Sequence, residues 1–489
     1  MLRGGGKASS HATMKLLRIL IPGMAVLALA GCETARSIVG APGGPPAGEQ
    51  GFVRGFLGGV AAEEPSAAAV ARAVLSSGGT AADAAAAAGF VLTVSLPSRA
   101  GLGGGGACLI YHPRRDAPEA LVFMPGAREG GLANADRPAA VPLMARGLFA
   151  LTTRMQGARP FEEIIIPAER LARFGVPMSR ALAADVAAVG SALLTDPNVR
   201  AVFTRADGSV VPVGDSFSNP ALAGTLTSLR SLGVGDLHQG ALARRLVEAV
   251  PLAGGGTLSL AELRAALPAV RPAIIETANG GDRVGFLPMD GGLAAAGAFR
   301  ALRAGQPDAD AQARGLSVGR AARSGAGADA AALLAQADLP GGSFGALPAS
   351  TGLTGFDREG GAVSCVFTMN NLFGTGRHAP GTGMLLAAAP NTGSVQPPLP
   401  AAAIAYNPNL RAFRMAVAGS GQQAAPMAVA GPLAANLLRG IVPGDAAGVA
   451  PAPGRSQLGV CPRYLPGRPA ECLAVSDPRG FGVALGAVE

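Results

Sequence analysis

The sequence predicts an α+β protein in which a helical region precedes a strand-rich region. Helical patterns occupy much of residues 66–93 and 161–267, whereas residues 351–370 alternate in the manner of strands. With 489 residues, 49% of them hydrophobic, the chain can bury a large core. This apolar content excludes a wholly disordered chain, and the missing glycine period excludes collagen.

The N-terminal residues are similar to a bacterial lipoprotein signal. A basic segment precedes an apolar run at 19–30, which is shorter than the ~20 residues that a membrane-spanning helix needs. Cys32 directly follows small residues, as a lipid-accepting cysteine does. We expect residues 1–32 to be a lipoprotein signal peptide, residues 33–58 a flexible tether, and the protein to face the periplasm in the cell envelope, held to a membrane by its lipid. The alternative is an ordinary secretory signal with a chance cysteine.

The net charge of +8 does not indicate nucleic-acid binding. Lys7 and Lys15 are the only lysines, the arginines are scattered, and only 4% of residues are aromatic. The four histidines show no metal-ligand spacing. We expect no nucleic-acid partner, no metal and no cofactor.

The remaining cysteines fall into two pairs of different character. Cys108 and Cys365 lie in apolar strand-like runs, and we expect both to be inert core residues. Cys461 and Cys472 flank a loop rich in Pro and Gly, and an oxidising periplasm favours a disulfide that closes it. Two free thiols are the alternative for that second pair.

The elements of the first region follow from capping and glycine signals. A helix over 66–77 ends at two glycines, and Thr80 with Asp83 forms a capping box for a helix to about residue 93. The glycine run 103–106 allows close backbone approach before a strand at 107–112. Further helical patterns occupy 161–174, 178–194, 222–232, 237–250 and 258–267. A weakly patterned stretch over about 304–349 is expected to be a mobile segment or a processed boundary.

A hairpin follows this stretch. Its turn, centred on Glu359, pairs residues whose numbers sum to 718. Ser350 then lies opposite Thr368, on the face that also carries Asn370. Solvent-facing strand hydroxyls are the alternative interpretation. A Ser-His-Asp hydrolase is poorly supported, because no Gly-x-Ser-x-Gly elbow follows a strand.

Four segments in the same order resemble the gamma-glutamyltransferase (glutathione hydrolase) family. They lie at 78–106, 167–175, 255–263 and 357–383. The resemblance implies an N-terminal-nucleophile hydrolase fold, an αββα four-layer sandwich with two stacked, mainly antiparallel sheets. Residues 59–489 would form one composite domain, with a large-subunit-like region at 59–349 and a small-subunit-like region at 350–489.

The same resemblance implies site residues. The nucleophile position falls on Ser350, where the family usually has Thr, and Thr351 is the fallback. Thr368 would orient the nucleophile, and Asn370 would bind substrate. Gly421, Gln422 and Gln423 match the family's oxyanion loop, where backbone N–H groups serve.

The implied activity is self-cleavage before Ser350, followed by hydrolysis or transfer of a gamma-glutamyl or related acyl group from a small amide or peptide. The α-amine of the new N-terminal residue would be the general base, and the two halves would stay together as a heterodimer. Three family positions differ here: the carboxylate-binding Arg falls near Met124 with Arg128 displaced, the acidic residue falls at about Thr392, and the Ser pair falls within 398–401. Glutathione is therefore expected to be a poor substrate. The alternative is a catalytically weak or inactive envelope or binding protein that keeps the fold.

Overall fold

The computed structural model describes residues 55–325, 329–344, 349–390, 392 and 396–486. The predicted signal peptide, Cys32 and most of the predicted tether lie outside these residues. Within the described part, no helix is both long and apolar enough to cross a membrane.

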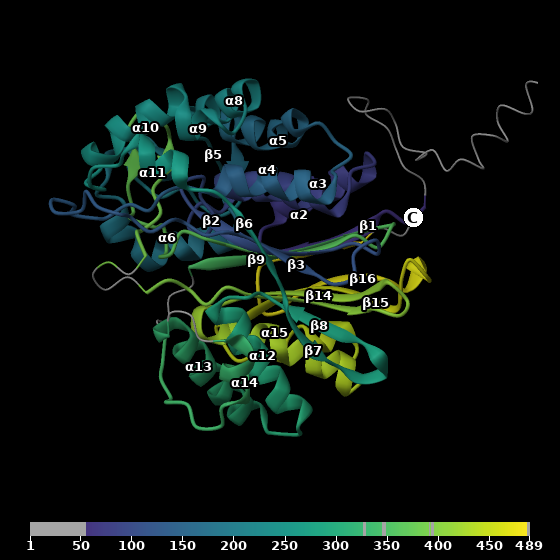
Figure 1. Cartoon of the computed structure of the whole chain (residues 1–489). Helices are drawn as coiled ribbons and strands as arrows, with labels where there is room; N and C mark the ends of the chain where they lie inside the picture. Colours follow the sequence, from purple (N-terminus) through teal and green to yellow (C-terminus); the bar gives the residue numbers. More distant parts are fainter. Residues whose placement is uncertain (1–54, 326–328, 345–348, 391, 393–395, 487–489) are drawn as a thin grey trace, which may run out of the picture. The chain divides into compact units, whose positions relative to one another are not determined.

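Two sheets stack face to face, and helices cover the outer face of each (Figure 1). The first sheet has the order β17-β1-β9-β10-β2-β3-β6 and the second the order β16-β15-β14-β13-β8-β7, and neighbouring strands within both sheets are antiparallel. The predicted αββα sandwich is therefore confirmed.

The strands of the two sheets come from both ends of the described chain. The first sheet contains β1 (Gly58–Ala62), β2 (Gly105–Tyr111), β3 (Glu119–Phe123), β6 (Ala269–Pro272), β9 (Ser350–Asp357), β10 (Ala362–Thr368) and β17 (Val483–Gly486). The second contains β7 (Ile274–Thr277), β8 (Arg283–Phe286), β13 (Ala401–Asn407), β14 (Ala412–Ser420), β15 (Arg455–Leu465) and β16 (Leu473–Ser476). Two small pairs join β4 (Val176–Pro177) to β5 (Ser216–Phe217) and β11 (His378–Ala379) to β12 (Met384–Leu385).

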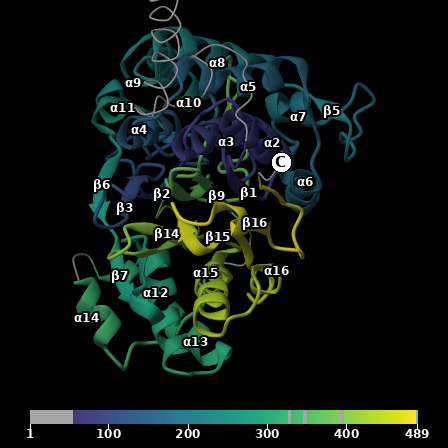
Figure 2. The ribbon, with the colours of Figure 1, turned by 90° about the vertical axis from the view of Figure 1, so that its right-hand side faces the viewer.

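The helices divide between the two outer layers, as the two views agree (Figures 1 and 2). Those beside the first sheet are α2 (Pro65–Ser76), α3 (Ala81–Ser95), α4 (Met144–Met155), α5 (Phe161–Phe174), α6 (Arg180–Leu193), α7 (Pro197–Phe203), α8 (Pro220–Leu232), α9 (Asp236–Gln239), α10 (Ala241–Leu252) and α11 (Leu260–Ala265). Those beside the second are α12 (Asp290–Arg303), α13 (Asp308–Ser324), α14 (Ala330–Ala335), α15 (Ala425–Leu433) and α16 (Pro443–Ala446).

Local signals account for the first-layer helices. The capping box at Thr80 and Asp83 is present, and α3 is buried along its whole length because its many alanines permit close packing. The helix predicted over 237–250 is instead two, α9 and α10, because the backbone at Gly240 leaves the helical conformation.

The stretch expected to be weakly structured, 304–349, contains α13 and α14. In α13 the buried positions are small or β-branched, including Gly315 and Val318. A Cβ at Gly315 would lie 2.7 Å from the carbonyl oxygen of Ala294, so α13 packs closely on α12 through this glycine. A helix that buries small residues has little hydrophobic periodicity, which explains why the prediction missed it.

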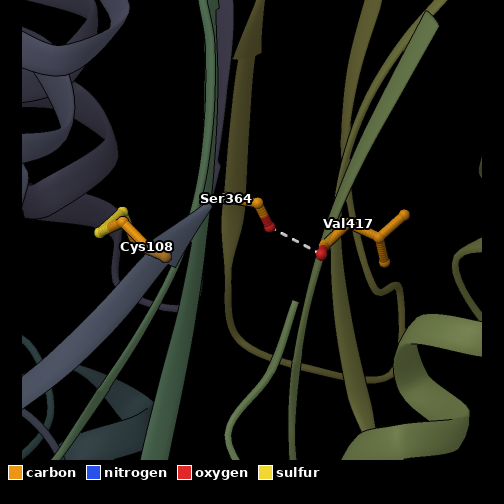
Figure 3. Close-up of a disulfide and its surroundings, with 4 residues drawn as sticks. Cys108, Ser364 and Val417 are labelled. Carbon is orange, nitrogen blue, oxygen red and sulfur yellow. Dashed lines mark hydrogen bonds between the residues drawn. A yellow bond between two sulfur atoms is a disulfide. The ribbon is translucent and has the colours of Figure 1, made fainter. Parts of the chain in front are cut away.

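The alternation predicted for β10 is confirmed. Cys365 packs in the core between the first sheet and its helices, whereas Ser364 faces the second sheet and donates a hydrogen bond to the carbonyl of Val417, at 2.7 Å (Figure 3). Cys108 and Cys365, expected to be inert core residues, are buried in the core but form a disulfide with each other, which the sequence analysis did not predict. They stand directly opposite in the β2–β10 pairing, which joins residues 257 positions apart and cannot be read from either run alone. Cys461 and Cys472 also form a disulfide.

Candidate active site

The hairpin of β9 and β10 brings the predicted nucleophile opposite Thr368. The pairing Thr368↔Ser350 is the one that the turn at Glu359 predicts, so the register is confirmed. Both side chains are fully buried. Because side chains alternate along a strand, Ser350 shares the face of Thr368 towards the second sheet, and Thr351, paired with Phe367, belongs to the opposite face.

The hydroxyl of Thr368 donates a hydrogen bond to the carbonyl oxygen of Ala349, at 2.7 Å. This carbonyl belongs to the peptide bond that precedes Ser350, so Thr368 contacts that bond in the intact chain, not the Ser350 hydroxyl. Ser350 Oγ is buried and has no hydrogen-bond partner among the described residues. A buried hydroxyl without a partner costs about 1–3 kcal/mol, so its placement beside a polarised carbonyl needs a functional reason.

Asn370 fixes Thr368 from the end of β10. Its backbone N–H donates to Thr368 Oγ1 at 2.8 Å, and its side-chain amide donates to the carbonyl of Ala388 at 2.9 Å. Its φ of 61° is left-handed, a conformation that Asn adopts more readily than most residues. The backbone and side chain of Asn370 are thus both used to order this end of the hairpin.

The predicted oxyanion loop connects β14 to α15. Gly421 has a φ of 103°, Gln422 has a φ of 52°, and a short 3₁₀ turn at Gln422–Ala424 leads into the helix. The first N–H groups of such a turn and helix have no partner within the helix, and they favour negative charge. The loop lies near β9, because a Cβ at Gly352 would be 3.1 Å from the Cβ of Ala418, close to the end of β14. Gln423 Oε1 also accepts a weak hydrogen bond from Phe344 N, at 3.4 Å.

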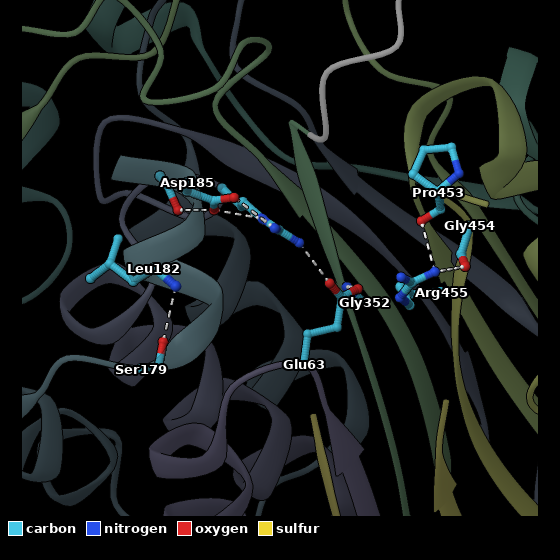
Figure 4. Close-up of polar contacts among 10 residues, drawn as sticks. Glu63, Ser179, Leu182, Asp185, Gly352, Pro453, Gly454 and Arg455 are labelled. Carbon is cyan, nitrogen blue, oxygen red and sulfur yellow. Dashed lines mark hydrogen bonds and ion pairs between the residues drawn. The ribbon is translucent and has the colours of Figure 1, made fainter. Parts of the chain in front are cut away.

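A charged cluster that the sequence analysis did not identify covers the other edge of β9 (Figure 4). Glu63, directly after β1, accepts a hydrogen bond from the N–H of Gly352 at 2.9 Å and pairs with Arg99 at 3.0 Å. Arg99 also binds Asp185 of α6 through two nitrogens, at 2.7 and 2.8 Å. Ser98 donates to the same aspartate at 2.7 Å. The cluster therefore contains two buried carboxylates and one guanidinium.

The environment of Glu63 has opposing effects on its acidity. Burial raises the pKa of Glu63 above its usual value, and it outweighs the lowering by Arg99, by the Ser420 hydroxyl and by the N–H of Gly352. No local sequence pattern predicts this cluster, because its members come from three segments that lie far apart in the sequence. The one available signal is Arg99, an arginine directly before a glycine run that the fold buries.

A cavity of about 200 Å³ adjoins this cluster. Its lining includes Glu63, Ser420, Gly421, Arg455 and Gln457. Gln457 is 1% exposed, and its Oε1 has no hydrogen-bond partner among the described residues. A larger cavity of about 500 Å³ lies at the Asp357 end of β9, seven positions from Ser350. We place the candidate site at the smaller cavity because Gly421 of the predicted oxyanion loop lines it, together with Glu63, which binds the N–H of Gly352 in β9.

The side chain of the displaced Arg128 is occupied by contacts with Glu262 and with backbone carbonyls. It is buried, binds Glu262 at 2.9 Å and donates to backbone carbonyls, among them that of Ala139. Thr392 bonds the carbonyl of Ala389 within its own turn, at 2.8 Å. Neither residue supplies the charge that the family uses to hold the ends of an amino-acid substrate.

Comparisons with known proteins identify a family and relatives that this chain resembles. The sequence model of the gamma-glutamyltranspeptidase family matches residues 67–314, a range that ends before Ser350. Glutathione hydrolase proenzyme 1 of Schizosaccharomyces pombe is 33% identical over 215 residues, covering 42% of this chain and 34% of that protein. The glutathione hydrolase proenzyme of Escherichia coli is 27% identical over 219 residues, covering 42% and 37%. The chain thus spans about a third of the length of these curated relatives.

A solved structure supports the fold over nearly the whole chain. The crystal structure of a cephalosporin acylase from Bacillus halodurans superposes with a TM-score of 0.71 and 18% identity, covering 92% of this chain and 99% of that one. At this identity the likeness concerns the fold alone.

Proposed function

The chain belongs to the gamma-glutamyltranspeptidase family, whose sequence model matches half of it, and we propose that it is a self-cleaving amide hydrolase or acyltransferase. The observation that carries this proposal is the hydrogen bond from the Thr368 hydroxyl to the Ala349 carbonyl, directly before Ser350, whose buried hydroxyl has no partner among the described residues. A carbonyl polarised by a buried donor, next to a buried nucleophile, is the arrangement that acyl transfer requires.

Self-cleavage would proceed through an ester. Ser350 Oγ attacks the carbonyl carbon of Ala349, the C–N bond of that peptide breaks, and the proton ends on the released α-amine. Water then opens the ester, leaving a carboxylate on Ala349 and a free hydroxyl and amine on Ser350. Thr351 is the weaker candidate, because its hydroxyl belongs to the opposite face of β9 from Thr368.

The cleaved protein would use Ser350 against external amides. Its α-amine takes the hydroxyl proton, the N–H groups of Gln422 and Gln423 stabilise the oxyanion, and Asn370 contacts the substrate. The two halves, which both contribute strands to each sheet, would remain a heterodimer. With the export and lipid signals predicted for residues 1–32, the enzyme would act in the periplasm from a membrane anchor.

The substrate class follows from what the site lacks. Each charge-assisted hydrogen bond that a family Arg or acidic residue would supply is worth about 1.5–3 kcal/mol. Arg128 is occupied by Glu262 and by backbone carbonyls, so it does not replace that contact. We therefore propose a gamma-glutamyl-like acyl amide with weaker demands on the free amino-acid end, and glutathione as a poor substrate.

The test is turnover of a panel of acyl amides by the cleaved protein. A chromogenic gamma-glutamyl anilide, glutathione and several non-glutamyl acyl anilides are compared for the wild type and Ser350→Ala. We expect turnover of at least one anilide, faster than glutathione, and none by Ser350→Ala. Complete cleavage without turnover of any panel member would favour the alternative, a protein that keeps the fold for binding in the envelope.

A further inference from the structure

Strand geometry determines on which side of β9 the Ser350 amine would be released. In an antiparallel strand, the N–H groups of residues two apart point to the same neighbouring strand. The N–H of Gly352 points to Glu63, on the β1 side. The N–H of Ser350 therefore points to this side as well, about 7 Å further along the strand. The carbonyl of Ala349 points the other way, to Thr368, as its hydrogen bond requires.

The cluster on this side contains two carboxylates and one guanidinium. Glu63 and Asp185 share the single guanidinium of Arg99, and all three are buried from bulk water. A nearby opposite charge stabilises the charged form of a titrating group, and the effect falls with distance. The cluster is thus suited to hold a cation at the start of β9.

Two arginines outside the cluster also line this cavity, and of these only Arg479 has an acidic partner among the described residues. Arg479 pairs with Asp477 at 2.6 Å, and Arg455 donates to the backbone carbonyl of Gly454 at 2.8 Å. Ser420 lines the same cavity and lowers the pKa of Glu63, although burial outweighs this effect. Figure 4 shows Glu63 beside Gly352, two residues from the predicted nucleophile.

We propose that Glu63 is the positioning residue for the Ser350 α-amine, so that hydroxyl, amine and carboxylate act in series as nucleophile, base and orienting group. This inference rests on the proposed function. As Ser350 Oγ bonds to the substrate carbonyl carbon, its proton passes to the α-amine, and the carboxylate of Glu63 stabilises the ammonium that results. The ammonium returns the proton to the leaving nitrogen when the C–N bond breaks. A third group that orients the base is the general logic of catalytic triads.

The experiment measures the pKa of this amine directly. The 140-residue piece from Ser350 to Glu489 contains no lysine, so its α-amine is its only amine. The full chain is expressed and allowed to cleave, then labelled briefly with acetic anhydride across a pH series. The mass of the piece reports labelling, and the pH dependence of labelling gives the pKa, independently of any substrate.

The informative variant is Glu63→Gln, which keeps an acceptor for Gly352 N–H and removes the charge. We expect the amine pKa to fall by about one unit or more. The acid limb of the pH profile of kcat/KM should move with it. The matched control is Glu64→Gln, because this neighbouring buried carboxylate turns to Ala67 N and Ser95 Oγ instead, at 2.8 and 2.7 Å. The control should leave the amine pKa unchanged.

The outcomes separate this inference from the proposed function. An amine pKa that is the same in wild type and Glu63→Gln, in a protein that is fully cleaved, would overturn the role of Glu63 alone. If Glu63→Gln does not fold, Asp185→Asn removes one charge from the same cluster and should shift the pKa in the same direction. A wild-type chain that stays uncut would overturn the proposed function together with this inference.

Discussion

The two edges of β9 at its first residues use different chemistry. On the β10 edge, Thr368 and Asn370 are neutral, and their hydrogen bonds run from one group to the next until they reach the Ala349 carbonyl. On the β1 edge, Glu63 belongs to a buried ionic cluster that holds the backbone at Gly352. The difference suggests a division of work: neutral donors polarise the carbonyl that is attacked, and the charged edge receives the amine that is released. Each prediction below disturbs one edge, or the far end of the strand, and leaves the other intact.

The largest effect on stability is expected from removing the guanidinium that pairs with both carboxylates of the charged edge. Arg99→Met leaves Glu63 and Asp185 buried without their common partner. Breaking a buried ion pair from one side costs about 3–5 kcal/mol, so the free energy of unfolding should fall by about that amount in urea denaturation. Arg173→Met is the control, since its partly exposed pair with Glu169 on α5 is worth no more than about 1 kcal/mol. Equal losses of unfolding free energy in both variants would show that the ion pairs of the cluster contribute no more to stability than an exposed pair does.

The next effect tests the neutral edge. Thr368→Val keeps the shape of the side chain and removes the hydrogen bond to the Ala349 carbonyl. Losing one oxyanion donor costs about 10²–10³-fold in rate, so the C-terminal piece should appear that much more slowly. Thr368→Ser, which keeps the hydroxyl, should cleave close to the wild-type rate. Normal cleavage by the valine variant would remove Thr368 from the chemistry.

Asp357 at the far end of β9 supplies a comparison outside the site. Burial raises its pKa to about 6, although the N–H groups of Ala81, Gly361 and Glu359 lower it. The folded protein therefore holds this proton more tightly than the unfolded chain does, and stability falls as pH rises from the ordinary 3.8 to about 6. The free energy of unfolding is expected to fall by roughly 3 kcal/mol across this window and to stay constant at higher pH.

Asp357→Asn should flatten this part of the pH–stability curve and leave the rate of cleavage unchanged. Chemical denaturation at pH values on both sides of the window measures the slope in each protein. A slope that persists in the variant would mean that another carboxyl is responsible. A change in cleavage would mean that the two ends of β9 are coupled.

The smallest effect concerns substrate contact. Asn370→Gly accommodates the left-handed backbone at this position and removes the side-chain amide. Losing one hydrogen bond to a substrate costs about 1 kcal/mol, so KM for an amide substrate should rise roughly fivefold while kcat changes little. Steady-state kinetics on the cleaved variant measures both constants. A fall in kcat with KM unchanged would instead place Asn370 with Thr368 as a group that acts on the reacting carbonyl.

The neutral edge could be predicted from sequence because it is local. The turn at Glu359 and the two-residue period of strands determine that Ser350 faces Thr368. The disulfide of Cys108 and Cys365 needs a pairing between distant strands, so the same kind of reasoning missed it.

The charged edge could not be predicted because its members come from three separate segments, before α2, before β2 and on α6. Each has an ordinary alternative: Glu63 could be a helix-flanking acid, Arg99 a surface cation and Asp185 the polar face of a helix. Only the fold buries them together. Helix α13 was not predicted for another reason: its contacts with α12 depend on small residues rather than on a hydrophobic stripe.

The central claim, that the chain cuts itself before Ser350, is tested most directly by the intact mass of the protein expressed with its export signal, beside Ser350→Ala and Thr351→Ala. We expect a 140-residue C-terminal piece of roughly 14 kDa in the wild type and in Thr351→Ala, and an uncut chain in Ser350→Ala. Cleavage lost only in Thr351→Ala would move the nucleophile to the other face of β9. A single uncut chain in all three proteins would contradict the account.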